Sequence, residues 1–273
     1  MRQQSKAIKM QLSACLQILC LFITYNHVHV HRCLVEAYLR RPNTLVGTVR
    51  DSTSLSYDGL KNSSVAEGSR LILVSLDSSK LDDPAKAVDA AKEAGITHLD
   101  IVIANAGISP PPGPLEAAPL NEVVDALQVN TISPIALYQA SKPLLEKSTK
   151  PIWISMSSAA GSITNLPEYQ AHWILGYGIS KAALDFFTVA VHAAHPNFIA
   201  YAIHPGLVQT ELGNGGAKMQ GLEKAPITLD DSVAKIIASV CTSPDARNLK
   251  HKTNTTYESR LIMLPAIILL ESF

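Results

Sequence analysis

Short apolar runs alternate along this chain with longer segments whose apolar residues recur every three or four positions. The short runs have the length and the bounding turn residues of β-strands, and they fall at residues 19–24, 44–50, 70–77, 98–107, 151–158 and 198–206. The periodic segments between them have helical spacing and cover residues 33–41, 83–95, 120–147 and 175–194. The pattern therefore predicts strands and helices in alternation.

Prolines and glycines mark the ends of the predicted helices. Pro84 stands near the start of segment 83–95 and Gly95 at its end, which is the asymmetry expected of a helix. Pro42 ends the first predicted helix, because proline cannot continue one. Pro134 lies inside the long segment 120–147, where we expect it to kink the helix.

Several predicted strands are apolar on both faces, which suits central parallel strands covered by helices. We predict an α/β fold, a single doubly wound parallel sheet of the Rossmann type. Its body is expected at residues 34–243. Residues 1–33 are expected to form an atypical segment that disrupts the first strand–helix unit, and residues 244–273 an atypical tail without a last strand. Ligands should bind beyond the carboxyl ends of the strands.

Composition excludes few functions but weighs against some partners. The chain has 273 residues, 47% of them hydrophobic, which is enough for a sizeable core. Lys+Arg and Asp+Glu are both 23, so the balance of charge supports neither nucleic-acid binding nor binding to an anionic membrane. The 4 cysteines fit neither a zinc site nor a disulfide framework, so we expect free thiols and a cytoplasmic protein.

The N-terminal apolar run allows a second interpretation. Basic residues precede residues 12–23, as in a secretory signal peptide, and acceptor motifs for glycosylation occur at Asn62 and Asn254. The residues after the run, TYNHVH, offer no small-residue cleavage site, and the run is shorter than the roughly 20 residues that span a bilayer. We therefore favour a buried first strand over a secreted protein.

The strongest chemical signal is Tyr177 followed by Lys181. Residues four apart are neighbours on one helix face. A phenol is a weak acid or base at pH 7, but a nearby ammonium favours the phenolate and should lower its pKa. Tyr177 could then exchange a proton with a carbonyl or an alcohol. For an isolated pair, an exposed tyrosine and lysine on an amphipathic helix would be the better interpretation.

Other polar residues stand at predicted strand ends or inside the long helix. Ser158 ends strand 151–158, where its hydroxyl could steady a reacting carbonyl oxygen or simply cap the strand. Asn130 lies inside a helix, where asparagine is mildly unfavourable, and could hold a water or bond to backbone. Asn105 and Gly107 form either a point of close cofactor approach or an ordinary turn.

Together these residues resemble the short-chain dehydrogenase/reductase family over residues 34–240. The markers are NAG at 105–107, Asn130, Ser158, the Tyr177–Lys181 pair and PGLVQT at 205–210. Residues 65–70, 95–107 and 205–217 resemble most the fungal reductases of the norsolorinic acid ketoreductase kind. The resemblance implies that Tyr177 donates the proton, that Lys181 lowers its pKa and holds the nicotinamide ribose, and that Asn130 supports a proton relay.

In the resembling family the serine positions the carbonyl, a role that falls on Ser158. Its spacing to Tyr177 is longer than usual, so Ser157 or Ser162 could take the role instead. The resemblance also implies a cofactor set made of Arg50, Asp77, Asn105, Tyr177, Lys181, Val208 and Thr210, and no metal. Lys142 is better explained as a solvated helix lysine.

Arg50 and Asp51, after the second predicted strand, bear on the choice of cofactor. An acidic side chain there accepts from a ribose 2′-hydroxyl, whereas an arginine accommodates a 2′-phosphate. Arg50 comes first, so we favour NADP. The plain alternative is a surface ion pair, which is worth little.

The resembling families carry a glycine-rich loop where this chain has residues 24–31, TYNHVHVH. Thr24 matches, but Tyr25, His29 and His31 occupy the glycine positions and should fill the phosphate space. The loop could bind phosphate differently, the chain could be a degenerate member, or residues 1–33 could be wrongly joined to a normal body, which we favour. His27, His29 and His31 would share one face of a strand, but they lack further ligands for a convincing metal site.

We thus expect an NADP-dependent oxidoreductase that reduces a hydrophobic or aromatic ketone, or oxidises the alcohol. The closer resemblance implies fungal polyketide metabolism, and the family implies a homo-oligomer. The rival from another class is a non-catalytic scaffold or regulator with this fold, which the missing glycines favour. The complete set of Asn130, Ser158, Tyr177 and Lys181 counts against that rival.

Overall fold

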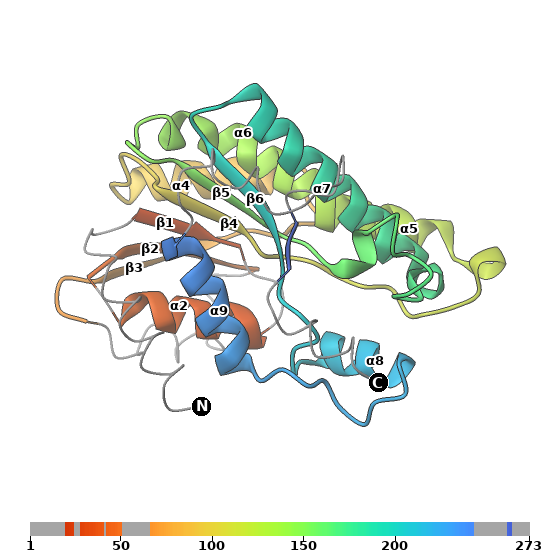
Figure 1. Ribbon diagram of the computed structural model, residues 1–273. Helices are drawn as coiled ribbons and strands as arrows, with labels where there is room; N and C mark the ends of the chain where they lie inside the picture. The colour runs from red at the N-terminus through yellow and green to blue at the C-terminus, as the bar shows by residue number, and fades with distance from the viewer. Residues whose placement is uncertain (1–19, 25–27, 41, 51–65, 243–260, 264–273) are drawn as a thin grey trace.

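A computed structural model describes residues 20–24, 28–40, 42–50, 66–242 and 261–263, without the side chains of 28–31, 241–242 and 261–263. Within these residues lies one seven-stranded sheet in the order β3-β2-β1-β4-β5-β6-β7, and every neighbouring pair is parallel (Figure 1). The strands are β1 Cys20–Ile23, β2 Thr44–Val49, β3 Arg70–Ser75, β4 Ile101–Ala104, β5 Ile152–Met156, β6 Ile199–His204 and β7 Leu261–Met263. The predicted doubly wound parallel sheet is confirmed.

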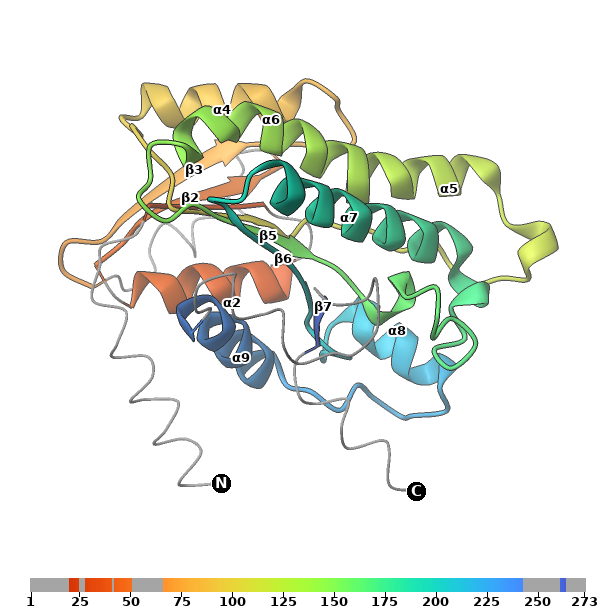
Figure 2. The same ribbon diagram turned by 45° about the horizontal axis from the view of Figure 1, so that its top comes forward.

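Helices cover both faces of the sheet. On one face lie α2 Val28–Leu39 and α9 Leu229–Thr242, and on the other α4 Asp83–Glu93, α6 Ser133–Leu145 and α7 Leu175–Ala194 (Figure 1). Figure 2 shows α5 Leu120–Leu127 ahead of α6 and beside the start of α7. The short helix α8 Glu211–Met219 follows β6.

The apolar residues 20–23 form a central strand. Leu21 and Ile23 pack into the core layer of α2 and α9, whereas Phe22 packs into the opposite layer. All three side chains are fully buried, which stabilises the fold by roughly 1.5–3 kcal/mol each. The preference for a buried first strand is confirmed for residues 20–23, and residues 12–19 lie outside the described part of the chain.

Elements at both ends of the chain add to the expected body of residues 34–243. The expected boundary at residue 34 falls inside α2. Residues 20–23 form β1 and residues 28–33 form the first turns of α2, so strand and helix of the first unit are both formed. The expectation of no last strand was wrong, because β7 pairs with Ala202, Ile203 and His204 of β6. A three-residue apolar strand is too short to stand out in an apolar tail.

The long predicted helix is interrupted before Pro134. A π-helical segment, η3 Gln128–Ile132, separates α5 from α6, and the Ser133 N–H bonds to the Gln128 carbonyl five residues back. Pro134 is the second residue of α6, so its missing N–H falls directly after the π-helical turn. The expected kink at Pro134 is thus a widened turn centred on Asn130, and such turns are frequent at functional sites.

Helix α7 with the preceding turn, Ala171–Ala194, is long and apolar enough to cross a membrane by length and composition alone. Its buried side chains, however, pack against β5 and β6. This packing explains the buried part of its apolar surface, whereas Ile179, Phe186 and Val189 of the same helix are exposed.

Candidate active site

The site is built where β1 and β4 lie side by side, the point at which the strand order reverses. Thr24, directly after β1, is buried, and its hydroxyl accepts hydrogen bonds from the backbone N–H groups of Asn105 and Ala106 at 2.8 and 3.0 Å. The Asn105 amide donates to the Thr24 carbonyl at 3.2 Å. Ligands of doubly wound sheets bind in the crevice at this reversal.

Asn130 fastens the loop after β4 to helix α7. Its side-chain oxygen accepts from the Ile108 N–H at 2.7 Å, and its amide donates to the Ile108 carbonyl and to Ser180 Oγ, both at 2.8 Å. The side chain is fully buried. Thr131 adds a bond to the Ser180 carbonyl at 2.8 Å. The π-helical turn therefore aims two polar side chains at the helix that carries Tyr177.

Lys181 is buried beneath the ring of Tyr177. Its Nζ donates to the Met156 carbonyl at 2.7 Å and lies 5.6 Å from the centroid of the Tyr177 ring. A Cβ on Gly107 would come within 3.2 Å of both Lys181 Nζ and Asn130 Oδ1. Gly107 thus lets the NAG turn approach the ammonium closely, and it joins Asn130 and Lys181 in one site.

The surroundings of Tyr177 shift its pKa in opposite directions. Burial raises it above the ordinary value and Asp185 raises it further, while a hydrogen bond with the Ser158 side chain lowers it. Lys181 was expected to lower this pKa, but its own pKa falls to about 8 because the ammonium is buried. Burial, which disfavours the charged phenolate, is the main cause of the raised pKa of Tyr177.

The serine alternatives differ in what they contact. Ser158 caps the short turn Ala159–Gly161, accepting from the Ala160 N–H at 3.2 Å, and it is the serine whose side chain meets Tyr177. Ser157 points instead toward Asp185, whose pKa it lowers. Ser162 accepts from the Asn165 N–H at 3.2 Å. The geometry therefore favours Ser158 as the serine beside the phenol.

The residues expected at the adenosine end lie along the same edge. Arg50 follows β2 and is exposed. Asp77 follows β3, and its pKa is lowered mainly by hydrogen bonds from Ser79 and to a smaller extent by the charge of Arg50. Asp77 accepts from the Ser79 N–H and hydroxyl at 3.0 and 2.7 Å. Asp51 lies outside the described residues. Arg50 and Asp77 therefore sit together at the carboxyl ends of neighbouring strands.

Val208 and Thr210 follow β6 on the other side of the crevice. Val208 is buried and pairs with Ile227. The Thr210 hydroxyl caps α8 by accepting from the Gly213 N–H at 3.0 Å. Gly213 is required there, because a Cβ would overlap the Val208 backbone. Both expected contact residues thus belong to a tight turn whose shape the α8 cap holds.

An apolar cavity of about 230 Å³ is lined in part by residues 173–176, which directly precede Tyr177 in the chain. It is walled by the proline-rich loop after β4, by the start of α5 and by the approach to α7. Gly113 ties this loop to the Trp173 carbonyl at 2.8 Å, and Trp173 is 42% exposed. The lining is Pro110–Gly113, Ala117–Pro119, Glu122, Val123 and residues 173–176. Such a lining suits an apolar or aromatic substrate.

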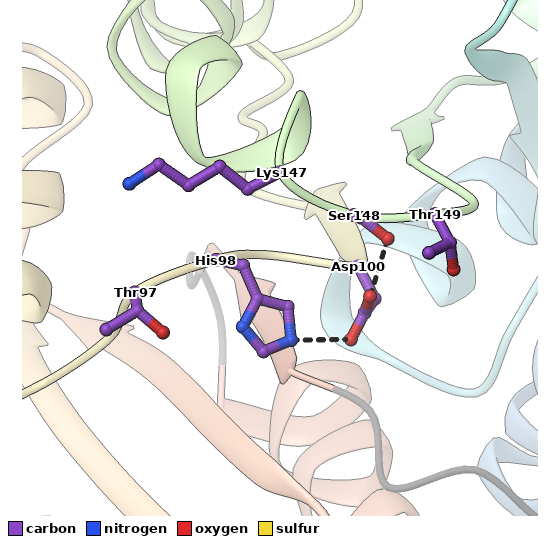
Figure 3. A pocket seen from close by; sticks show the side chains of 6 residues that line it. All are labelled: Thr97, His98, Asp100, Lys147, Ser148 and Thr149. Carbon is purple, nitrogen blue, oxygen red and sulfur yellow. Dashed lines mark hydrogen bonds and ion pairs between the residues drawn. The ribbon is translucent and has the colours of Figure 1, made fainter.

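A larger hollow of about 440 Å³ lies at the opposite edge, before β4 and β5 (Figure 3). There Asp100 binds Ser148 Oγ at 2.6 Å, His98 Nε2 at 3.5 Å and the Cys20 N–H at 2.9 Å. These contacts tie loops and a strand end together at the amino edge of the sheet, away from Tyr177. The polar side chains that line the larger hollow therefore have a structural role.

Two lesser predictions concern residues away from this set. Lys142 pairs with Glu146 at 2.5 Å one turn along α6, as expected of a solvated helix lysine. His29 and His31 belong to the first turn of α2, so the strand-like face expected for them does not exist. Their side chains and all of His27 lie outside the described residues, as does most of the TYNHVHVH loop.

Three site residues were missed by sequence reasoning. The sequence pattern placed Thr24 only in the altered loop, and it gave no role to Ser180 or Asp185. Asp185 follows Lys181 by four residues, so the same helical spacing that singled out Tyr177 and Lys181 would have found it.

The comparisons with known proteins agree with this geometry. The family model described as enoyl-(acyl carrier protein) reductase matches residues 48–231. A short-chain dehydrogenase, srdF, of Neurospora crassa is 43% identical over 209 residues, covering 75% of this chain and 82% of the relative. The norsolorinic acid ketoreductase of Aspergillus parasiticus is 35% identical over 213 residues, covering 77% of this chain and 79% of the relative.

A solved structure with a similar fold is the NADPH-bound carbonyl reductase from chicken fatty liver. It is 25% identical, has a TM-score of 0.71, and the match covers 83% of this chain and 88% of that one. The carbonyl reductase Sniffer of D. melanogaster is also 25% identical, with a TM-score of 0.68 and coverage of 83% and 92%.

Proposed function

Because this chain belongs to the short-chain dehydrogenase/reductase family, we propose that it is an NADP-dependent reductase of hydrophobic or aromatic ketones, or oxidises the corresponding alcohols. The observation that carries the proposal is the cluster of Asn130, Ser158, Tyr177 and Lys181 at the carboxyl edge of the sheet. The similarity to norsolorinic acid ketoreductases supports a role in fungal secondary metabolism.

The residues of the crevice fit a dinucleotide. Gly107 leaves space beside Lys181 Nζ that a Cβ would fill, and the ammonium has donors beyond its one bond to Met156. Lys181 and Tyr177 would hold the nicotinamide ribose, Val208 and Thr210 the nicotinamide end, and Asn105 and Asp77 the adenosine. Arg50 supports NADP over NAD, because a guanidinium matches a 2′-phosphate. When bound, this cofactor supplies the hydride.

The protein residues would handle the carbonyl and its proton. Ser158 would donate a hydrogen bond to the carbonyl oxygen and hold it near the Tyr177 hydroxyl. Tyr177 would then pass its proton to the oxygen as the alcohol forms. Asn130 would act by holding the Ile108 loop against α7, and it would support the proton relay through Lys181. The apolar cavity walled by residues 110–113 and 173–176 would take the body of the ketone.

The first experiment is a titration of the full-length protein with NADPH, with NADH for comparison, followed by cofactor fluorescence. Saturable micromolar binding that is tighter for NADPH would support the proposal, and NADPH consumption with aromatic ketones would then be measured. No binding by a folded protein would mean that the altered loop at residues 24–31 closes the phosphate site. The chain would then be a non-catalytic member of the family, as the missing glycines suggest.

The proposal includes a cytoplasmic location. The burial of residues 20–23 in β1 and the free thiols of Cys20 and Cys33 support it. Cell fractionation would test it. An intact, unglycosylated chain in the cytosol is expected, and modification at Asn62 or Asn254 would contradict the proposal.

A further inference from the structure

Helix α7 carries a third ionisable residue on the stripe that holds Tyr177 and Lys181. Asp185 lies one turn beyond Lys181 and two turns beyond Tyr177, so the three side chains follow one another along the helix. Its carboxyl is largely buried, and the Oδ1 atom has no hydrogen-bond partner among the described residues. A buried carboxylate is costly unless an opposite charge or hydrogen bonds compensate it.

The surroundings of Asp185 supply such compensation from two elements. Burial raises the pKa of Asp185 to about 6, whereas the Ser157 hydroxyl and the Lys181 ammonium both lower it. Ser157, at the end of β5, approaches closely enough to act on the carboxyl, although no well-aligned hydrogen bond joins Ser157 Oγ to Asp185 Oδ1. The carboxyl thus lies against β5 and in the field of Lys181.

The effect of Asp185 on Lys181 is reciprocal. Burial lowers the pKa of Lys181 to about 8, and Asp185 is the group that raises it again. The other groups that face Lys181 carry no negative charge at neutral pH. They are the Tyr177 phenol on α7, the Met156 carbonyl at the end of β5, Gly107 in the loop after β4 and Asn130 in η3.

We propose that Asp185 is a positioning residue of the reduction, whose carboxylate, set against Ser157 one helical turn beyond Lys181, keeps the buried Lys181 ammonium charged beside Tyr177. The role rests on the proposed function, in which a charged Lys181 holds the cofactor ribose next to the proton donor. Asp185 itself touches neither the substrate nor the reacting atoms.

The sign of the pH effect follows from the charges. Removal of the negative charge lets Lys181 lose its proton at lower pH, because Asp185 raises the pKa of Lys181. It also lowers the pKa of Tyr177, which Asp185 raises. Ketone reduction needs the protonated phenol and the charged lysine, so both changes move the alkaline limb of the rate profile to lower pH.

The experiment compares Asp185→Asn with Asp185→Glu, which keeps the charge. The profile of kcat against pH for ketone reduction with NADPH should shift its alkaline limb to lower pH by about one pH unit in Asp185→Asn. Asp185→Glu should return the alkaline limb to the pH at which it lies in the unmutated protein. The matched control Asp89→Asn, which removes an exposed carboxylate paired with Lys92 on α4, should leave it unchanged. An unshifted limb in a folded, active Asp185→Asn variant would overturn the proposal.

A second measurement does not depend on turnover. The titration of Lys181 is followed by NMR of ¹³C-labelled lysine side chains, with its signal assigned by the loss of that signal in Lys181→Arg. The midpoint should fall in Asp185→Asn and return in Asp185→Glu. In the unmutated protein the Lys181 signal should show a second inflection near pH 6, where Asp185 titrates. This inflection needs no variant, so the coupling can be tested even if Asp185→Asn folds poorly.

The two readouts separate this inference from the proposed function. A protein without reductase activity in which Asp185→Asn still lowers the Lys181 midpoint would overturn the proposed function and keep the coupling. An active protein whose Lys181 signal has neither the inflection nor the lowered midpoint would overturn the role of Asp185 and keep the function.

Discussion

The side-chain amide of Asn130 donates a hydrogen bond of 2.8 Å to Ser180 Oγ, across 50 residues of chain. Ser180 Oγ donates in turn to the Tyr177 carbonyl at 2.8 Å. The π-helical turn, the loop after β4 and the first turns of α7 are therefore held by one buried network. Asparagine in mid-helix is tolerated there because every polar atom of its side chain is satisfied.

Asn130→Ala should destabilise the protein by about 2–4 kcal/mol, because it leaves several hydrogen-bonding groups of Ile108 and Ser180 unsatisfied. Ser180→Ala, which removes one member of the network, should cost about 1 kcal/mol. Urea denaturation of both single variants and the double variant gives the coupling between the two sites. Additive losses would show that the network has no cooperative role.

Gly107→Ala should lower kcat/KM for ketone reduction on the order of 10- to 100-fold, since its Cβ would push Lys181 Nζ and Asn130 Oδ1 from their places. Gly215→Ala is the matched control, because a Cβ on that residue in α8 meets nothing within 4 Å. The control should leave turnover unchanged and stabilise α8 slightly. Equal activities of the two variants would show that close approach at Gly107 is unimportant.

Tyr177→Phe should reduce kcat by about 10²- to 10⁴-fold, because it removes the proposed proton donor. The denaturation midpoint should hardly change. Tyr138→Phe is the control: it removes another phenol hydroxyl, on α6, that is buried without a hydrogen-bond partner among the described residues. It should keep full activity. Unchanged turnover in Tyr177→Phe would disprove the mechanism.

Arg50→Gln should weaken NADPH binding about tenfold, which corresponds to about 1.4 kcal/mol, and leave NADH binding unchanged. The reason is that only the 2′-phosphate needs the guanidinium. Arg70→Gln serves as control, because Arg70 starts β3 at the amino edge and donates to the Ala94 carbonyl at 2.6 Å. Fluorescence titration of both variants with NADPH and NADH measures these affinities. An equal loss of affinity for both cofactors in Arg50→Gln would show that Arg50 does not select the 2′-phosphate.

His204, the last residue of β6, should make the fold sensitive to acid. Burial lowers its pKa from 6.5 to about 4. The folded state favours the neutral imidazole, so this contribution to stability is fully present above pH 6.5. It is lost as the pH falls from 6.5 toward 4, and the total loss is about 3 kcal/mol.

His204→Gln should remove this part of the acid dependence, measured as the denaturation midpoint at several pH values. Asp185 changes the stability in the opposite direction over a similar pH range. Its pKa is raised from 3.8 to about 6, so its protonation as the pH falls favours the folded state. The difference between the variant and the unmutated protein isolates the histidine. Replacement of the exposed His172 should leave the dependence as it was.

The sequence could predict the order of elements and the edge where the chemistry gathers. Strand and helix periods are local properties, and the apolar runs 98–107 and 151–158 led directly to β4 and β5. Tyr177 and Lys181 were recognisable because four residues make one turn of helix. The three-residue strand β7 was missed, because so short a run carries no periodic signal.

Sequence by itself thus determined the parallel fold, the family resemblance and the residue types of the site. Tertiary structure alone decided that Ser158 rather than Ser157 meets Tyr177, that Thr24 holds Asn105, and that burial raises the pKa of Tyr177. The physical reason is that these outcomes depend on burial and on contacts between residues far apart in the chain. Neither is contained in the local periodicity from which strands and helices are read.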